Sequence, residues 1–145
     1  MKSTAILDLM VKDHKILLNY LKDVENNLGQ DFGFLSNSFN SFQWNLEKHF
    51  FVEERAVFTN YNPDYLDKQY DYFSDLMNQH TKILKIIESL RNKLEKREPF
   101  DLIELKKLLI EHKTFEEENI YPVLDKEIDE LEKRFIIERI KDIKL

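Results

Sequence analysis

Residues 49–54 read His-Phe-Phe-Val-Glu-Glu, and residues 112–117 read His-Lys-Thr-Phe-Glu-Glu. In both blocks a glutamate follows the histidine by four residues, so the two side chains lie on the same face of a helix. Each block also follows a lone histidine by about thirty residues, because His14 precedes the first block and His80 precedes the second. This repeat predicts helices that direct imidazole and carboxylate groups toward one another.

The chain has four histidines, and each lies on the apolar stripe of its predicted helix. If that stripe covers about a third of a helix surface, four randomly placed histidines would all face inward roughly once in a hundred cases. The alternative interpretation is a bundle with ordinary core histidines. Burying two unpaired carboxylates would be costly, however, whereas a pair of dications would turn them into ligands. We therefore predict a metal site formed by His14, His49, Glu53, His80, His112 and Glu116.

The composition indicates one helical domain. At 145 residues the chain is long enough to form a core without disulfides, and we expect a single domain over residues 1–145. Two glycines and three prolines indicate few turns. The absence of cysteine excludes thiolate zinc sites, iron–sulfur ligation and thiol redox chemistry.

The charge and hydropathy patterns exclude several classes of partner. A formal charge of −6, with basic residues interleaved among acidic ones, argues against nucleic acid. No apolar stretch approaches the roughly 18 residues that a membrane span requires. The first residues lack a signal-peptide hydrophobic run, because the chain is charged again at Asp8. We expect a soluble, cytoplasmic protein.

Apolar periodicity predicts helices over about residues 3–28, 33–58, 63–97 and 101–121, and a shorter one over about 124–143. Gly29 is expected to end the first helix in a left-handed conformation, and Asn62 to cap the third. Asp101 with Glu104 has the spacing of a capping box for the fourth helix, and Tyr121-Pro122 is expected to end it.

Short connections make neighbouring helices antiparallel. The predicted fold is therefore all-α: an antiparallel up-down-up-down four-helix bundle over about residues 3–121, with a short C-terminal fifth helix over about 124–143. At 1.5 Å per residue the four histidines lie roughly 16 to 26 Å from one end of the bundle, close to one layer. The third helix is too long at its start, so residues 63–69 are expected to overhang the bundle or bend away.

The types of donor limit which metal ions the site could bind. Imidazole with carboxylate and no thiolate suits iron, manganese or zinc. Six donors exceed the four that a single structural zinc needs, which favours two ions. Ferritin-like sites use a glutamate followed by a histidine three residues later, and the order and spacing here are different.

The order histidine, His-x-x-x-Glu, histidine, His-x-x-x-Glu resembles the hemerythrin-like, or HHE cation-binding, domain family. Paired glutamates followed by an aromatic residue match that family at Glu53-Glu54 with Phe58, and at Glu116-Glu117 with Tyr121. The resemblance covers about residues 10–122.

The resemblance implies a cofactor of two non-haem iron ions, joined by an oxo or hydroxo group and by carboxylates. His14 and His49 would bind one iron, His80 and His112 the other, and Glu53 and Glu116 would bridge them. Oxygen-carrying members have a further histidine one turn before the third-helix ligand, where this chain has Leu76. The ligand set is similar to that of di-iron proteins that repair iron–sulfur clusters.

The expected ligand is a small diatomic molecule or peroxide. The function that we predict is reaction with, or sensing of, nitric oxide, oxygen or peroxide, in a nitrosative or oxidative stress response or in cluster repair. Reversible oxygen binding or storage, and a bundle with a purely structural metal, are the alternatives. Glu54 and Glu117 are either partners of the ligands or solvated side chains. Trp44 and Phe51 are expected in the core.

Overall fold

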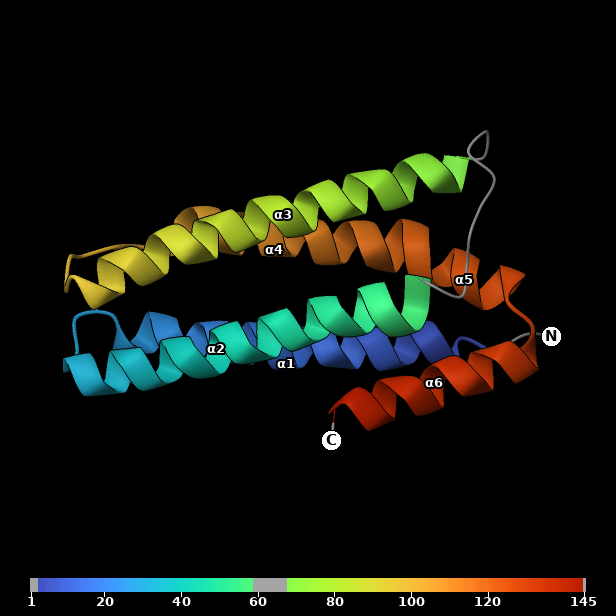
Figure 1. Ribbon diagram of the computed structural model, residues 1–145, viewed down its shortest axis with the longest axis horizontal. Coiled ribbons are helices and arrows are strands. Elements are labelled where there is room, and N and C mark those ends of the chain that lie inside the picture. Colours follow the sequence, from blue (N-terminus) through green and yellow to red (C-terminus); the bar gives the residue numbers. More distant parts are fainter. Residues whose placement is uncertain (1–2, 59–67, 145) are drawn as a thin grey trace.

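The structure is a computed structural model that describes residues 3–58 and 68–144 (Figure 1). Across these residues the chain is helical, with no strand. The long helices are α1 (Ala5–Asn27), α2 (Phe32–Val52), α3 (Lys68–Glu95) and α4 (Ile103–Phe115). The antiparallel pair α1–α2 lies beside the antiparallel pair α3–α4, which confirms the predicted four-helix bundle (Figure 1).

The connections follow the turn residues. Gly29 has φ +80°, the left-handed conformation that was predicted to end the first helix. Arg97, with φ 57°, takes the same conformation just after α3, two residues before Pro99. The carboxylate of Asp101 accepts a hydrogen bond from the Ile103 backbone N–H, at the first residue of α4. The predicted cap at Asn62 and the overhang before residue 68 fall outside the described residues.

Two π-helical turns follow the His-x-x-x-Glu blocks. The turn η1 (Glu53–Val57) continues α2, and the turn η3 (Glu116–Ile120) continues α4. The Phe58 N–H donates to the Glu53 carbonyl and the Tyr121 N–H to the Glu116 carbonyl, a five-residue step in both cases. Because a π-turn holds one extra residue, the side chain five positions on is turned back toward the glutamate's face of the helix. The sequence analysis did not predict these turns.

The prediction that Tyr121-Pro122 ends the fourth helix is wrong. The chain continues from η3 into α5 (Tyr121–Glu127), with Pro122 in its first turn. Proline is tolerated there because the backbone N–H that it lacks is not needed so near a helix start. The predicted helix over 124–143 is consequently divided between α5 and α6 (Glu130–Lys144), which are separated by extended backbone at Ile128.

The helix α6 folds back along α1, α2 and η1 (Figure 1).

A buried polar contact joins α5 and α6 to the start of α1. The Asp125 carboxylate accepts hydrogen bonds from the backbone N–H groups of Ile6 (3.0 Å) and Leu7 (2.9 Å), at the start of α1. The buried Lys133 ammonium lies 3.3 Å from the same carboxylate. An acid at a helix N-terminus satisfies free N–H groups and favours the helix dipole.

Two apolar clusters fill the bundle. One cluster packs α1 to α4 toward the end of the bundle where the α1–α2 and α3–α4 connections lie, and includes Leu21, Phe39, Phe42 and Leu105. The other packs α1, η1 and η3 against α5 and α6, and includes Met10. The histidines and glutamates of the two blocks lie between these clusters, so the apolar core continues on both sides of the polar layer. No helix among the described residues is long and apolar enough to cross a membrane.

The prediction of core positions for Trp44 and Phe51 is wrong. Trp44 is 67% exposed and Phe51 is 50% exposed. The two residues are seven positions apart, two helical turns, so they share one face of α2. The buried face of the same helix carries Phe39, Phe42 and Leu46.

Candidate metal centre

The structure brings all six predicted site residues together in one buried layer. Each bundle helix contributes a histidine, and each π-turn begins with a glutamate. Glu53 and Glu116 are fully buried, and all four histidines are buried as well. Two groups of donors could each hold a metal ion, with the ligand atoms in each group within 4.8 Å of one another. One group comprises His14, His49 and Glu116, and the other comprises Glu53, His80, His112 and Glu116.

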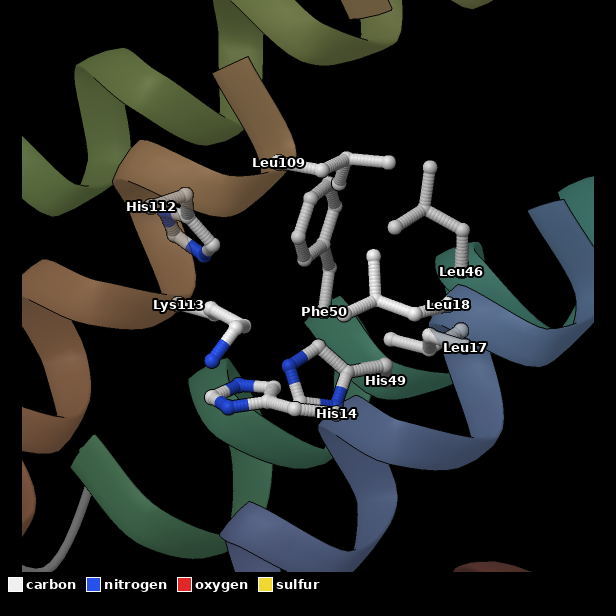
Figure 2. A pocket seen from close by; sticks show the side chains of 9 residues that line it. All are labelled: His14, Leu17, Leu18, Leu46, His49, Phe50, Leu109, His112 and Lys113. Atoms are coloured by element: carbon white, nitrogen blue, oxygen red, sulfur yellow. The ribbon is translucent and has the colours of Figure 1, made fainter. Parts of the chain in front are cut away.

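The first group joins the α1–α2 pair to η3. The rings of His14 and His49 lie side by side with their centroids 4.9 Å apart (Figure 2). Glu116 Oε1 lies 3.1 Å from His14 Nε2 and 4.0 Å from His49 Nε2. The carboxylate nearest to His49 is that of Glu53, whose Oε1 lies 2.7 Å from His49 Nε2.

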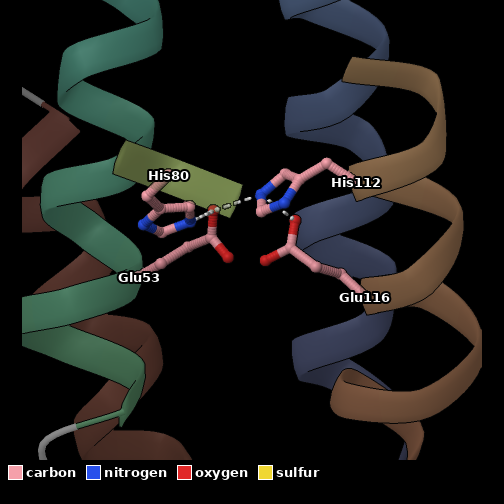
Figure 3. Close-up of side chains that lie close together, drawn as sticks. All are labelled: Glu53, His80, His112 and Glu116. Atoms are coloured by element: carbon pink, nitrogen blue, oxygen red, sulfur yellow. Dashed lines mark ion pairs between the residues drawn. The ribbon is translucent and has the colours of Figure 1, made fainter. Parts of the chain in front are cut away.

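The second group joins the α3–α4 pair to both π-turns (Figure 3). Glu53 Oε1 lies 3.6 Å from His80 Nε2 and 3.8 Å from His112 Nε2. Glu116 Oε1 lies 3.1 Å from His112 Nε2. Figure 3 shows the two carboxylates beside the imidazoles, with one oxygen of each directed toward the other. Oε1 of each glutamate therefore lies among ring nitrogens from both halves of the chain.

The outer ring nitrogen of every histidine is held by an acceptor. Nδ1–H of His14 donates to Glu117 at 2.7 Å, and Nδ1–H of His80 donates to Glu54 at 2.9 Å. The two glutamates whose role the sequence left open thus orient the two lone histidines. An acceptor at Nδ1 fixes the tautomer and directs Nε2 inward, as is usual for metal-ligating histidine.

The acceptors for the remaining two histidines were missed by the sequence analysis. Nδ1–H of His112 donates to the amide oxygen of Gln79 at 2.7 Å, and Nδ1–H of His49 donates to the Asp13 carboxylate. Asp13 directly precedes one lone histidine and Gln79 directly precedes the other. The only signal in the sequence was this adjacency. A neighbour of an inward residue points about 100° away from it, toward the adjacent helix.

Four of the inward-facing atoms lack hydrogen-bond partners. Nε2 of His80 and His112 are buried without one, and His49 Nε2 and Glu53 Oε1, although 2.7 Å apart, are not aligned for a hydrogen bond. Buried polar atoms in folded proteins are nearly always paired, so a group of unpaired ones directed at a common volume requires an explanation. A nitrogen lone pair and a carboxylate oxygen repel each other at these distances unless a proton or a metal cation lies between them. The donor set therefore fits a cation site.

The charges in the layer support the same conclusion. Burial lowers the pKa of His14 and of His112 to about 4, so both rings are neutral at neutral pH. Burial opposes ionisation of Glu53, but the nearby charge of His49 and the close approach of the His112 and His80 rings hold the pKa of its carboxyl well below its usual range. Burial would also lower the pKa of His49, but the carboxylates of Glu53 and Asp13 raise it to about 9. Ionised Glu53 and the neutral rings of His14 and His112 are therefore in the states that bind metal, whereas His49 must first lose its proton.

A fully buried tyrosine completes the site. The Tyr121 hydroxyl lies 2.8 Å from Glu53 Oε2 and 2.9 Å from Glu116 Oε2. The sequence predicted Tyr121 only as a helix end and as part of the family pattern. Its role in the site depends on the π-turn η3, because residues five apart on a regular α-helix lie on different faces.

The comparison with protein families agrees with this geometry. Residues 5–124 match the model of the hemerythrin HHE cation binding domain. The chain therefore belongs to the hemerythrin HHE cation-binding domain family, and it carries two buried histidine–glutamate clusters that are candidate metal sites. Comparisons with curated proteins and with solved structures gave no match.

Proposed function

We propose that this protein binds two iron ions in the buried layer and reacts with, or senses, a small molecule such as nitric oxide, oxygen or peroxide. The proposed ligands are His14, His49, Glu53, His80, His112 and Glu116. The observation that carries the proposal is the set of inward Nε2 atoms and the Glu53 oxygen that have no hydrogen-bond partner. Four imidazoles and two carboxylates suit iron, and they also suit manganese or zinc.

The number of donors favours reactivity over a closed structural site. Six protein ligands shared by two ions leave coordination positions free, even where both carboxylates bridge. Bound iron would supply electrons and an open position for a small molecule. The protein supplies the rigid arrangement of donors, because every histidine is held at its outer nitrogen as well.

A small pocket lies beside the first group of donors. Its volume is about 20 Å³, enough for one water or one diatomic molecule. Apolar side chains wall it, and His14, His49 and His112 face it, while the Lys113 ammonium points toward the imidazoles (Figure 2). The apolar part of the wall consists of Leu17, Leu18, Leu46, Phe50 and Leu109. These features support a small ligand rather than an organic substrate.

Leu76 argues against the alternative of reversible oxygen storage. Its side chain is fully buried on α3, one turn before His80. Oxygen-carrying members of the family place an additional histidine at this position. An apolar side chain there leaves the corresponding ion with one nitrogen ligand fewer, which favours oxidation or ligand sensing over a long-lived reversible complex.

Iron loading tests the proposal. The chain should be refolded anaerobically with ferrous iron, and we expect about two irons per chain, with an optical spectrum that changes under air and under nitric oxide. Glu116→Gln should lose at least one iron. Glu111→Gln is the matched control, because Glu111 lies on the exposed face of the same helix and should leave the iron content unchanged. Fewer than about 1.5 irons per wild-type chain would refute a two-iron site.

A second measurement addresses the alternative of a purely structural metal. Because apolar clusters lie on both sides of the polar layer, we expect the chelated protein to remain helical. Metal should still raise the melting temperature, because it binds the folded state alone. Circular dichroism of the chelated protein measures this, and complete loss of helix on chelation would support the structural role instead.

A further inference from the structure

The Tyr121 hydroxyl is the point at which the two candidate bridging carboxylates meet. Tyr121, Glu53 and Glu116 are each fully buried. The hydroxyl is nearly equidistant from the two Oε2 atoms, at 2.8 Å and 2.9 Å. Because Glu53 follows α2 and Glu116 follows α4, this one hydroxyl connects the two halves of the bundle directly.

In each glutamate, the two carboxylate oxygens have different neighbours. Oε2 is held by the phenol, while Oε1 faces the ring nitrogens, at 2.7 Å from His49 for Glu53 and at 3.1 Å from His112 for Glu116. A carboxylate anchored at one oxygen cannot rotate freely about its last side-chain bond. The hydroxyl has a single proton, which the two Oε2 atoms share, so the phenol sets the direction in which Oε1 points for both glutamates.

The corresponding position in the first half of the chain has no hydroxyl. Phe58 follows Glu53 by five residues, as Tyr121 follows Glu116, and the π-turn η1 precedes it as η3 precedes Tyr121. The Phe58 ring packs on Phe73 instead, with centroids 5.0 Å apart. An aromatic ring without a hydroxyl can therefore pack at the position that follows a π-turn. The Tyr121 hydroxyl is therefore not required for the ring to pack, and its contacts are with the two carboxylates.

We propose that Tyr121 is a positioning residue: its hydroxyl holds Oε2 of Glu53 and of Glu116, so that both carboxylates present Oε1 to the metal pair in one fixed arrangement. This inference rests on the proposed two-metal function. Hydrogen bonds of this kind around metal ligands change metal affinity by about 10- to 100-fold.

The test compares two tyrosine variants in an anaerobic titration with Co²⁺, whose visible absorption reports coordination number. Tyr121→Phe should weaken Co²⁺ binding by about 10- to 100-fold and change the absorption spectrum of the loaded protein. Tyr72→Phe is the matched control. Tyr72 packs edge-on against Phe115 with centroids 5.5 Å apart, and its hydroxyl should not matter for the site.

A role in packing alone predicts a different result. In that case Tyr121→Phe would leave both the Co²⁺ affinity and the spectrum as in the wild type, and the inference would be wrong. A third protein, with 4-aminophenylalanine introduced at position 121, keeps a donor in the same place and should retain the wild-type spectrum. That protein also serves as the test if Tyr121→Phe does not fold, and a spectrum unlike the wild type would then overturn the inference. Failure of the wild-type protein to bind Co²⁺ or iron would overturn the proposed function itself, and this inference with it.

Discussion

In the first half of the bundle the histidine before the π-turn, His49, donates a hydrogen bond to the Asp13 carboxylate. In the second half its counterpart, His112, donates to the Gln79 amide. The two halves otherwise use the same spacing of histidine and glutamate and the same π-turn. Yet the pKa of His49 is raised to about 9, whereas burial lowers that of His112 to about 4.

The difference shows how outer acceptors change a site whose inner donors are alike. A carboxylate at Nδ1 favours the protonated ring, and an amide at the same place does so much less. Glu53 is the larger cause of the raised pKa of His49, because its Oε1 is 2.7 Å from His49 Nε2 but 3.8 Å from His112 Nε2. Before metal binds, one half of the site therefore holds a proton that the equivalent histidine of the other half lacks.

The largest expected effect concerns pH. His49 keeps its proton up to about pH 9, and a metal must displace that proton to bind. Apparent affinity for Co²⁺ should therefore rise about tenfold per pH unit below pH 9 and then level off, which is about a thousandfold from pH 6 to pH 9. His80, whose pKa is also raised, would add to the slope, while His14 and His112 are already deprotonated. Competition titrations over this range measure the slope, and a flat profile would contradict the assignment of the proton to His49.

Exchanging the outer acceptors tests the comparison directly. Asp13→Asn should lower Co²⁺ affinity at pH 9 by about 10- to 100-fold, and Gln79→Glu should raise it, because a carboxylate at Nδ1 makes imidazole a stronger donor. The pH slope should become shallower in the first variant and steeper in the second. Asp23→Asn, on the exposed side of α1, is the control. If both substitutions changed the Co²⁺ affinity equally and in the same direction, the acceptors would only hold the rings in place.

The smallest effect is expected one turn before each lone histidine. Leu76 precedes His80 by four residues and Met10 precedes His14 by four, and both side chains are fully buried. Met10 packs within the apolar cluster that joins α1, η1 and η3 to α5 and α6. Leu76→His should therefore offer a further nitrogen ligand and change Co²⁺ affinity by less than about tenfold, with an altered spectrum. Met10→His should lower the melting temperature without altering the spectrum, and a spectral change in both variants would mean that the two halves are equivalent here.

Much of the site was predictable because helical periodicity is a local property. Four histidines on apolar stripes, with a glutamate one turn after two of them, predicted which six side chains lie in the buried layer. The bundle topology followed from short connections between amphipathic segments. Gly29 was correctly expected to be left-handed, because the backbone geometry of a helix end depends on few neighbours.

The sequence by itself determined which six side chains face the buried layer, the class of fold and the family resemblance, since these depend on residue type and on spacing along one helix. Only the tertiary structure decided what each donor contacts on the next helix: Asp13 on His49, Gln79 on His112, and Tyr121 on both glutamates. The π-turns belong to the same group, because an extra residue in a turn is stabilised by what its side chains reach across the bundle. Contacts between helices depend on their relative rotation and height to within a few ångströms. No periodicity in one segment encodes those quantities, so the outer shell of this site emerged only from the packed fold.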